Sequence, residues 1–298
     1  MSAPPTDKIT FSRRERVAGY VALTKPRIIE LLLVTTVPTM FVAERSVPSV
    51  WLMLATVVGG SLAAGGANAV NMVIDRDIDG LMERTMHRPL VRGVMSPRAA
   101  LTFAVVIEVV AFAWLFTTVN PLSALLAVSA TFFYVFVYTL WLKRTTTQNI
   151  VIGGAAGAVP VLVGWSAVTN SLGWAPVVLF LVIFFWTPPH FWALAIRYRE
   201  DYSAASVPML PAVATLAATA RKITLYTVML VGTTLVFAPV ADMGAVYVAA
   251  ALILGALFGV LALAVQRDPT ERAAMRLFSY SITYVTLLFA AMIVDVLV

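Results

Sequence analysis

Long apolar runs alternate with short polar stretches along most of the chain. A transmembrane helix needs about 20 apolar residues, and nine stretches approach that length. They span about 28–43, 50–74, 99–118, 121–142, 149–168, 174–196, 223–239, 244–265 and 277–298. The first and seventh stretches are short, so we expect these helices to extend into the polar residues beside them. The pattern predicts an all-α, polytopic bundle of nine transmembrane helices.

Basic residues lie almost entirely on one side of this predicted bundle. The chain contains 21 lysines and arginines, and all except Arg45 fall on the same side as the N-terminus. Cytoplasmic segments of membrane proteins are enriched in such residues. We therefore predict a multi-pass protein of the inner (cytoplasmic) membrane. Its N-terminus is expected in the cytoplasm and, because nine is odd, its C-terminus outside.

Composition agrees with a membrane protein. Hydrophobic residues make up 60% of the chain, charged residues 12%, and mean hydropathy is +0.90, whereas a soluble domain is about one quarter charged. Cysteine is absent, which excludes disulfides and thiolate metal sites. We expect residues 1–26 to form an exposed, basic, cytoplasmic arm and residues 27–298 a single transmembrane domain. No nucleic-acid partner is expected.

Two long cytoplasmic loops, about residues 75–98 and 197–222, hold most of the ionisable groups. At the start of the first, Asn71, Asp75 and Asp79 recur at steps of four, which places them on one face of a helix. Carboxylates bind divalent cations, and cations together with arginines bind phosphate. The pattern indicates a metal–phosphate site, with acids paired to nearby arginines at a solvated helix end as the alternative.

Four basic side chains follow that stripe or emerge on the same cytoplasmic face. Arg84 and Arg88 come directly after it, and Lys143 and Arg144 end the fourth predicted helix. Guanidinium groups suit the oxygens of a diphosphate. We predict that all four contact phosphate, and the alternative is ordinary basic enrichment of the inner face.

The end of the sixth predicted helix carries a second group of polar side chains. Pro188 and Pro189 are expected to break this helix within the membrane, because proline lacks a backbone donor. His190 follows directly and is a candidate functional residue, unless it only bonds a carbonyl that the prolines free. A candidate second polar site, with a cation or ion pairs, follows: Arg197, Tyr198, Glu200 and Asp201.

These segments together resemble the UbiA-type intramembrane prenyltransferases. The matching motifs are KPRIIELL at 25–32, NxxxDxxxD at 71–79, RTxxRPL at 84–90, YTxxLKR at 138–144, NIVIGGAAGAVP at 149–160, TPPHFWALA at 187–195 and REDYxxAxVPMLP at 199–211. The last two are most similar to the branch of the family that acts on haem. Quinone-directed members usually carry a second aspartate-rich motif in that region.

The resemblance implies a helical bundle around a central cavity that opens at the cytoplasmic rim. It implies transfer of a farnesyl group from farnesyl diphosphate to a vinyl group of haem B, with water added and diphosphate released. The product would be haem O, used in haem–copper oxidases. Mg²⁺ would be the cofactor, held by Asp75 and Asp79 with Asn71, and Glu200 and Asp201 are further candidate ligands.

On the haem side, the resemblance implies a role for His190 as axial ligand, positioning group or water-activating base. Lys25, Arg27 and Arg197 are candidate contacts for the haem propionates. Expected partners are farnesyl diphosphate, haem B and the lipid bilayer, with haem A synthase or oxidase assembly factors as further candidates.

Two alternatives share part of this pattern. A UbiA-type prenyltransferase that acts on a quinone or chlorophyll precursor would have the same aspartate motif. A transporter or haem-binding membrane module would also have broken helices and buried carboxylates. Transporters usually hold their polar groups near the membrane midplane, whereas here these groups crowd one rim, which favours an enzyme.

Overall fold

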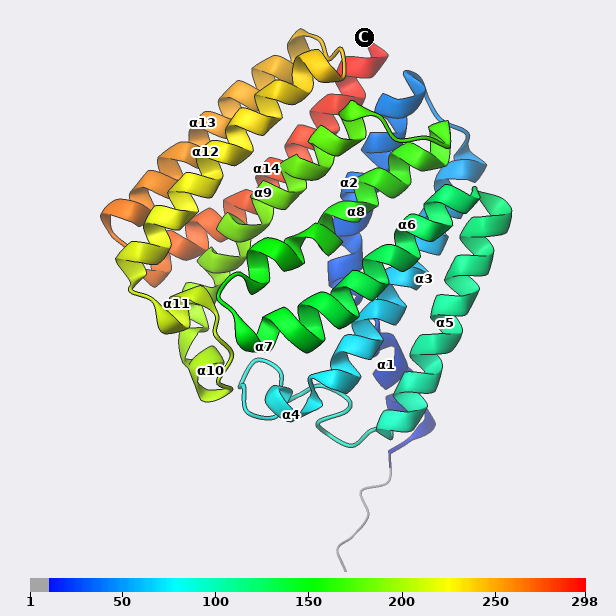
Figure 1. The fold of residues 1–298 in the computed structure, drawn as a ribbon, viewed down its shortest axis with the longest axis vertical. Coiled ribbons are helices and arrows are strands. Elements are labelled where there is room, and N and C mark those ends of the chain that lie inside the picture. Colours follow the sequence, from blue (N-terminus) through cyan, green and yellow to red (C-terminus); the bar gives the residue numbers. More distant parts are fainter. Residues whose placement is uncertain (1–10) are drawn as a thin grey trace, which may run out of the picture.

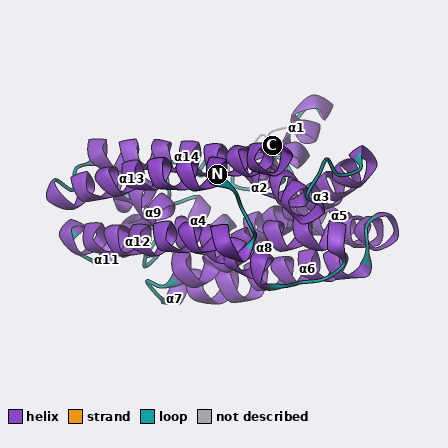
Figure 2. Ribbon diagram, turned by 90° about the horizontal axis from the view of Figure 1, so that it is seen from above, coloured by secondary structure: helices purple, strands orange, loops and turns teal. Residues whose placement is uncertain are grey.

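A computed structural model describes residues 11–298, apart from the side chains of residues 27–33. Within that range it is a bundle of long helices without strands, which confirms the predicted fold class (Figures 1 and 2). Eight helical segments are long and apolar enough to cross a membrane, and α2 occupies the position of the first predicted span. The long elements are α2 (Pro26–Glu44), α3 (Val50–Ile74), α5 (Pro97–Thr118), α6 (Pro121–Phe132) continued by η1 (Phe133–Leu142) and α7 (Lys143–Thr145), α8 (Asn149–Thr169), α9 (Trp174–Arg197), α12 (Leu216–Val240), α13 (Ala245–Arg267) and α14 (Glu271–Leu297).

Short helices gather at one end of the bundle, at the bottom of Figure 1, and the chain's C-terminus lies at the other end. They are α1 (Arg13–Leu23), α4 (Arg76–Asp79), α10 (Arg199–Ala204) and α11 (Leu210–Val213). The two charged loops touch there, because the Asp201 carboxylate accepts the backbone N–H of Arg84 at 3.3 Å. This contact brings together loops that are more than a hundred residues apart in sequence.

The second charged loop is shorter than predicted. α12 begins at Leu216, and its N-cap Thr215 accepts the Ala218 backbone N–H at 3.2 Å, which satisfies a free donor of the first turn. Arg221 and Lys222 therefore lie in the helix rather than in the loop. Because the apolar run starts after the first turns of α12, hydropathy placed the boundary too late.

The predicted break at Pro188 and Pro189 was wrong, because α9 runs unbroken from Trp174 to Arg197 with both prolines inside it. Trp186 donates from Nε1 to the Ser281 carbonyl of α14 at 2.8 Å. Neighbouring helices can hold a proline-containing membrane helix together, and α9 packs against α8, α12 and α14.

The predicted basic arm is only partly exposed. α1 starts with a capping box, in which the Ser12 and Glu15 side chains each accept the other's backbone N–H, an arrangement that stabilises a helix start. Gly19 and Leu23 are buried, and an added Cβ at Gly19 would lie 2.8 Å from Met95. α1 therefore packs on the segment before α5, while residues 1–10 of the arm lie outside the described residues.

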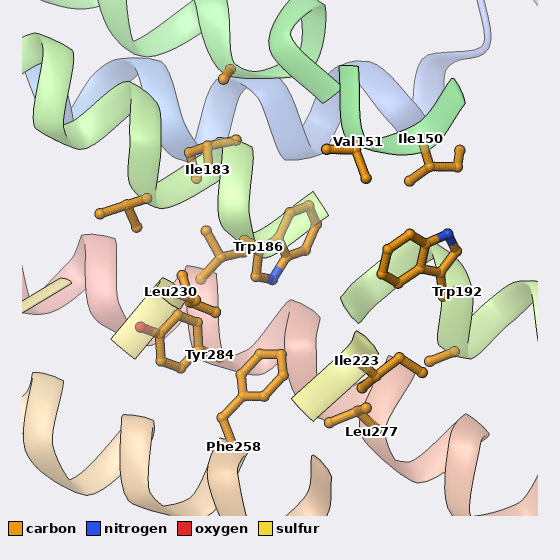
Figure 3. Packing of buried hydrophobic residues seen from close by; sticks show 14 of the residues in the cluster. Ile150, Val151, Ile183, Trp186, Trp192, Ile223, Leu230, Phe258, Leu277 and Tyr284 are labelled. Carbon is orange, nitrogen blue, oxygen red and sulfur yellow. The ribbon is translucent and has the colours of Figure 1, made fainter. Parts of the chain in front are cut away.

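The largest apolar core lies among α9, α12, α13 and α14. Figure 3 shows Trp186, Leu230, Phe258 and Tyr284, one from each helix, converging in it. The Tyr284 hydroxyl lies 2.8 Å from the Thr234 hydroxyl, so its polar atom is satisfied within the core. This packing holds α9 in place beside the charged end of the bundle.

Candidate active site

Asn71, Asp75 and Asp79 lie on one face of the α3–α4 segment. The Asp75 N–H donates to the Asn71 carbonyl and the Asp79 N–H to the Asp75 carbonyl, both at 2.9 Å. The helical bonding pattern thus continues across the junction. All three residues are buried, at 3% exposure or less, and Asn71 Nδ2 donates to Asp75 Oδ2 at 2.8 Å. The predicted stack is therefore present in the structure.

Each buried aspartate has a close cationic partner on its Oδ2 atom. Lys143 Nζ lies 2.5 Å from Asp75 Oδ2, and Arg88 Nη1 lies 2.6 Å from Asp79 Oδ2. Two of the four basic residues predicted to bind phosphate are thus placed directly on the aspartate pair, one from α7 and one from the loop after α4.

Two further cations complete the surroundings. Lys25 Nζ donates to Asn71 Oδ1 at 2.9 Å, and burial lowers the pKa of Lys25 to about 7. Arg144 lies 3.7 Å from Asp75 Oδ1 and pairs more closely with Asp77 at 2.7 Å, where its hydrogen bond lowers the Asp77 pKa to about 2. Lys25, a candidate propionate contact by sequence, therefore belongs to the aspartate cluster.

Among the described residues, no hydrogen-bond donor reaches the second oxygen of either buried aspartate. These atoms, Asp75 Oδ1 and Asp79 Oδ1, are both buried, and an unsatisfied buried acceptor is costly. Burial raises the pKa of Asp79 against the opposing effect of Arg88. A divalent cation would satisfy both oxygens and favour their charged form. The donor set therefore fits Mg²⁺, which uses one or two carboxylates together with phosphate oxygens.

Thr139 belongs to this cluster, although it was not among the predicted site residues. η1 is a π-helix, and the Thr139 hydroxyl donates to the Tyr134 carbonyl five residues earlier at 2.8 Å. The same hydroxyl accepts from Asn71 Nδ2 at 3.1 Å. π-helical turns are rare and frequently occur at functional sites. Its place in the YTxxLKR motif was the only signal for this residue, because most of the residues around it are apolar.

The residues of the candidate second polar site hold the two loops together. Besides its backbone contact with Asp201, Arg84 lies over the rings of Tyr198 and Tyr202, at 5.4 and 5.8 Å from their centroids. Glu200 is exposed. Among the described residues no group of three or more carboxylates or histidines is placed to share a metal. A metal role for Glu200 or Asp201 therefore stays a prediction, without support from a shared cluster.

His190 lies in the contact between α9 and α14. Its Nδ1 is 2.6 Å from the Ser281 hydroxyl, and its ring stacks between Trp186 and Phe278, at centroid distances of 4.3 and 4.7 Å. A hydroxyl of α14, rather than a carbonyl freed by the prolines, is thus its partner. This bond leaves Nε2 as the ring nitrogen that a ligand would meet.

The other residues predicted on the haem side are placed as follows. Arg197 Nε lies 3.4 Å from Glu271 Oε1 of α14, and its guanidinium lies 5.7 Å from the centre of the Tyr198 ring. The Arg27 side chain falls outside the described residues. Within the described part of the chain, Arg197 forms no ion pair with the aspartates of the cluster, although it shares the Tyr198 ring with Arg84.

Sequence comparison finds similar proteins along most of the chain. Residues 32–291 match the sequence model of the UbiA prenyltransferase family. A protoheme IX farnesyltransferase of Frankia casuarinae is 55% identical over 289 residues, covering 95% of this chain and 99% of its own. The protein of the same name from Streptomyces avermitilis is 54% identical over 286 residues, covering 94% of each chain.

Solved structures show the same fold at low sequence identity. A digeranylgeranylglyceryl phosphate synthase aligns with a TM-score of 0.77 and 17% identity, over 95% of this chain and 99% of its own. A UbiA homologue from Archaeoglobus fulgidus, bound to DMAPP and Mg²⁺, aligns with a TM-score of 0.63 and 14% identity, over 91% and 99% of the two chains.

Proposed function

Because this chain belongs to the UbiA prenyltransferase family, we propose that it transfers the farnesyl group of farnesyl diphosphate to a vinyl group of haem B. Water is added, diphosphate is released, and the product is haem O. The observation that carries the proposal is the buried pair Asp75 and Asp79, each of which has a close cation on one oxygen and, among the described residues, no hydrogen-bond donor on the other. The relatives above 50% identity that are named protoheme IX farnesyltransferases support haem as the acceptor.

Diphosphate leaves only when the negative charge that develops on it is neutralised. Asp75 Oδ1 and Asp79 Oδ1 would hold Mg²⁺, which supplies positive charge to the leaving group when it is bound. Lys143 and Arg88 already lie beside these carboxylates and would contact phosphate oxygens as well. Asn71 orients Asp75 through its amide, so we infer a positioning role for it alongside the predicted metal contact.

Departure of diphosphate leaves a farnesyl group with cationic character, which must be kept from water until the acceptor reacts. A helical bundle within lipid excludes water from its interior. Arg84 and Arg144, at the charged end, complete the proposed phosphate contacts. The haem must then be bound with a vinyl carbon next to the farnesyl group. We assign haem binding to the residues around α9.

The acceptor is tested with purified protein, Mg²⁺, farnesyl diphosphate and haem B. We expect a haem product whose mass has increased by one farnesyl group and one hydroxyl group, because the remaining proton of the added water leaves with the diphosphate. A quinone precursor is offered in parallel, because other members of the superfamily would share the aspartate motif. Farnesylation of that precursor without a haem product would contradict the proposed acceptor and favour the quinone-directed alternative.

Replacing His190 with alanine should shift the absorption spectrum of bound haem. Its Nδ1 bonds the Ser281 hydroxyl, so Nε2 is the nitrogen that would bind the haem iron. Axial ligation is a common role for histidine in haem proteins. A Ser281→Ala variant is the matched control, because it keeps the imidazole and removes only its partner. Lost turnover with an unchanged spectrum would instead assign His190 to base or positioning chemistry.

We propose that the charged end of the bundle faces the cytoplasm. Because the chain has no cysteine, single cysteines report topology without background. Val47→Cys, exposed at the end opposite the charged loops, should react with an impermeant maleimide in intact cells. His87→Cys, exposed in the first charged loop, should react only after lysis. The reverse labelling pattern would invert the orientation.

A further inference from the structure

A groove of about 800 Å³ opens between α9, α13 and α14. Two of its lining residues, Arg197 at the end of α9 and Glu271 at the start of α14, place it at the end of the bundle where the short helices gather. Its lining combines three arginines, one carboxylate and apolar surface: Arg197, Arg272, Arg276, Glu271, Leu261 and Met275. A groove of this kind suits a ligand with an anionic edge and an apolar body.

The positive charge of this groove is only partly compensated. Glu271 pairs with Arg197 at 3.4 Å. Among the described residues, Arg272 and Arg276 have no carboxylate within ion-pair distance. They stand four residues apart on α14, where like charges are neighbours and repel each other. Two anionic groups held between them would remove that repulsion and form charge-assisted hydrogen bonds.

The Tyr198 ring contacts both an arginine of the groove and an arginine of the first charged loop. Tyr198 has the Arg197 guanidinium 5.7 Å from its ring centre and the Arg84 guanidinium 5.4 Å from it. Arg84 belongs to the loop that also carries Arg88, the partner of Asp79. A flat ligand anchored at Arg272 and Arg276 would therefore extend past Tyr198 toward the diphosphate half of the site.

We propose that this groove binds the two propionate carboxylates of the haem acceptor, chiefly through Arg272 and Arg276. The inference rests on the proposed function, which supplies haem as the acceptor. A haem carries both propionates on one edge and its vinyl groups toward the opposite edge. Anchoring the propionates here turns the vinyl edge toward Asp75 and Asp79, and Leu261 and Met275 offer apolar contact to the macrocycle.

The test compares haem B with its dimethyl ester, which keeps the macrocycle and vinyl groups but lacks the carboxylate charges. Binding to the purified full-length protein is followed by haem absorbance. Wild-type protein should bind the ester on the order of ten-fold or more weakly, as expected when charge-assisted hydrogen bonds are lost. The double variant Arg272→Gln/Arg276→Gln should lose the same factor for haem B and nothing further for the ester.

Arg267→Gln is the matched control, because Arg267 is exposed at the end of α13 and does not line the groove. Its haem affinity should equal that of wild type, and KM for farnesyl diphosphate should be unchanged in every variant. Equal haem affinity in the double variant and wild type overturns the proposal. Thermal stability is also measured with added phosphatidylglycerol. If the double variant loses only the stabilisation by this lipid and keeps its haem affinity, the groove binds a lipid headgroup and the proposal is overturned.

The two proposals fail in different ways. If wild-type protein forms no haem O, the proposed function is wrong, whereas the binding titration still decides the groove. If haem O forms normally in the double variant at low haem concentration, the groove assignment is wrong and the proposed function stands.

Discussion

Asp79→Asn should lower the rate of farnesyl transfer roughly a hundred- to a thousand-fold, the size of loss seen when one electrostatic contact to a reacting group is removed. The amide keeps the shape of the side chain but removes the charge of the free Oδ1 atom. It also leaves Arg88 without its partner at 2.6 Å. The rate is measured as haem O formation by the purified protein, with the Mg²⁺ concentration varied.

Asp77→Asn is the matched control for this variant. Asp77 lies in the same short helix, α4, and its side chain is 59% exposed and paired with Arg144. Its loss should change turnover only a few-fold. Near-normal haem O formation by Asp79→Asn would contradict the proposal that Asp79 binds Mg²⁺. Equal losses in both variants would mean that the total charge of the loop matters rather than one buried oxygen.

The second large effect is on folding. Gly164→Ala should destabilise the protein by about 1–3 kcal/mol, the usual cost of overpacking a tight contact. A Cβ at Gly164 would lie 2.6 Å from the Thr36 carbonyl oxygen of α2, and a backbone atom cannot rotate away. The contact between α2 and α8 must therefore open. Thermal unfolding of the detergent-solubilised protein, followed by tryptophan fluorescence, measures the change.

Gly157→Ala is its control, because Gly157 lies two turns earlier in the same helix. A Cβ there would meet no other atom within 4 Å, and alanine favours helix over glycine. This variant should be as stable as wild type or slightly more stable. Equal destabilisation by both substitutions would show that α8 needs glycine for a reason other than its contact with α2.

The apolar pattern predicted the bounds of a helix well where the helix is apolar from its first turn. The segment 50–74 was predicted and α3 spans Val50–Ile74. α14 begins at Glu271, six residues before its predicted start, because its first turns are polar. Hydropathy reports the part of a helix that lies in lipid, whereas the helix itself begins at its cap.

The candidate site was predictable where the pattern is local. Asn71, Asp75 and Asp79 share a face by helical spacing alone, and the structure keeps that arrangement. The contacts of Asn71 with Lys25 and Thr139 join residues 46 and 68 positions apart. Such pairings depend on how helices pack, so no spacing rule in a single sequence reveals them.

The pairing of the buried aspartates sets an electrical balance for whatever enters the site. When Lys25 is protonated, the surrounding cations exceed the carboxylates by a single charge, counting Lys25, Arg88, Lys143 and Arg144 against Asp75, Asp77 and Asp79. A diphosphate group carries several negative charges, so its binding alone would make the site net negative. One divalent cation would neutralise two of these negative charges. The pocket is therefore closest to neutrality when substrate and metal arrive together, so each should tighten the binding of the other.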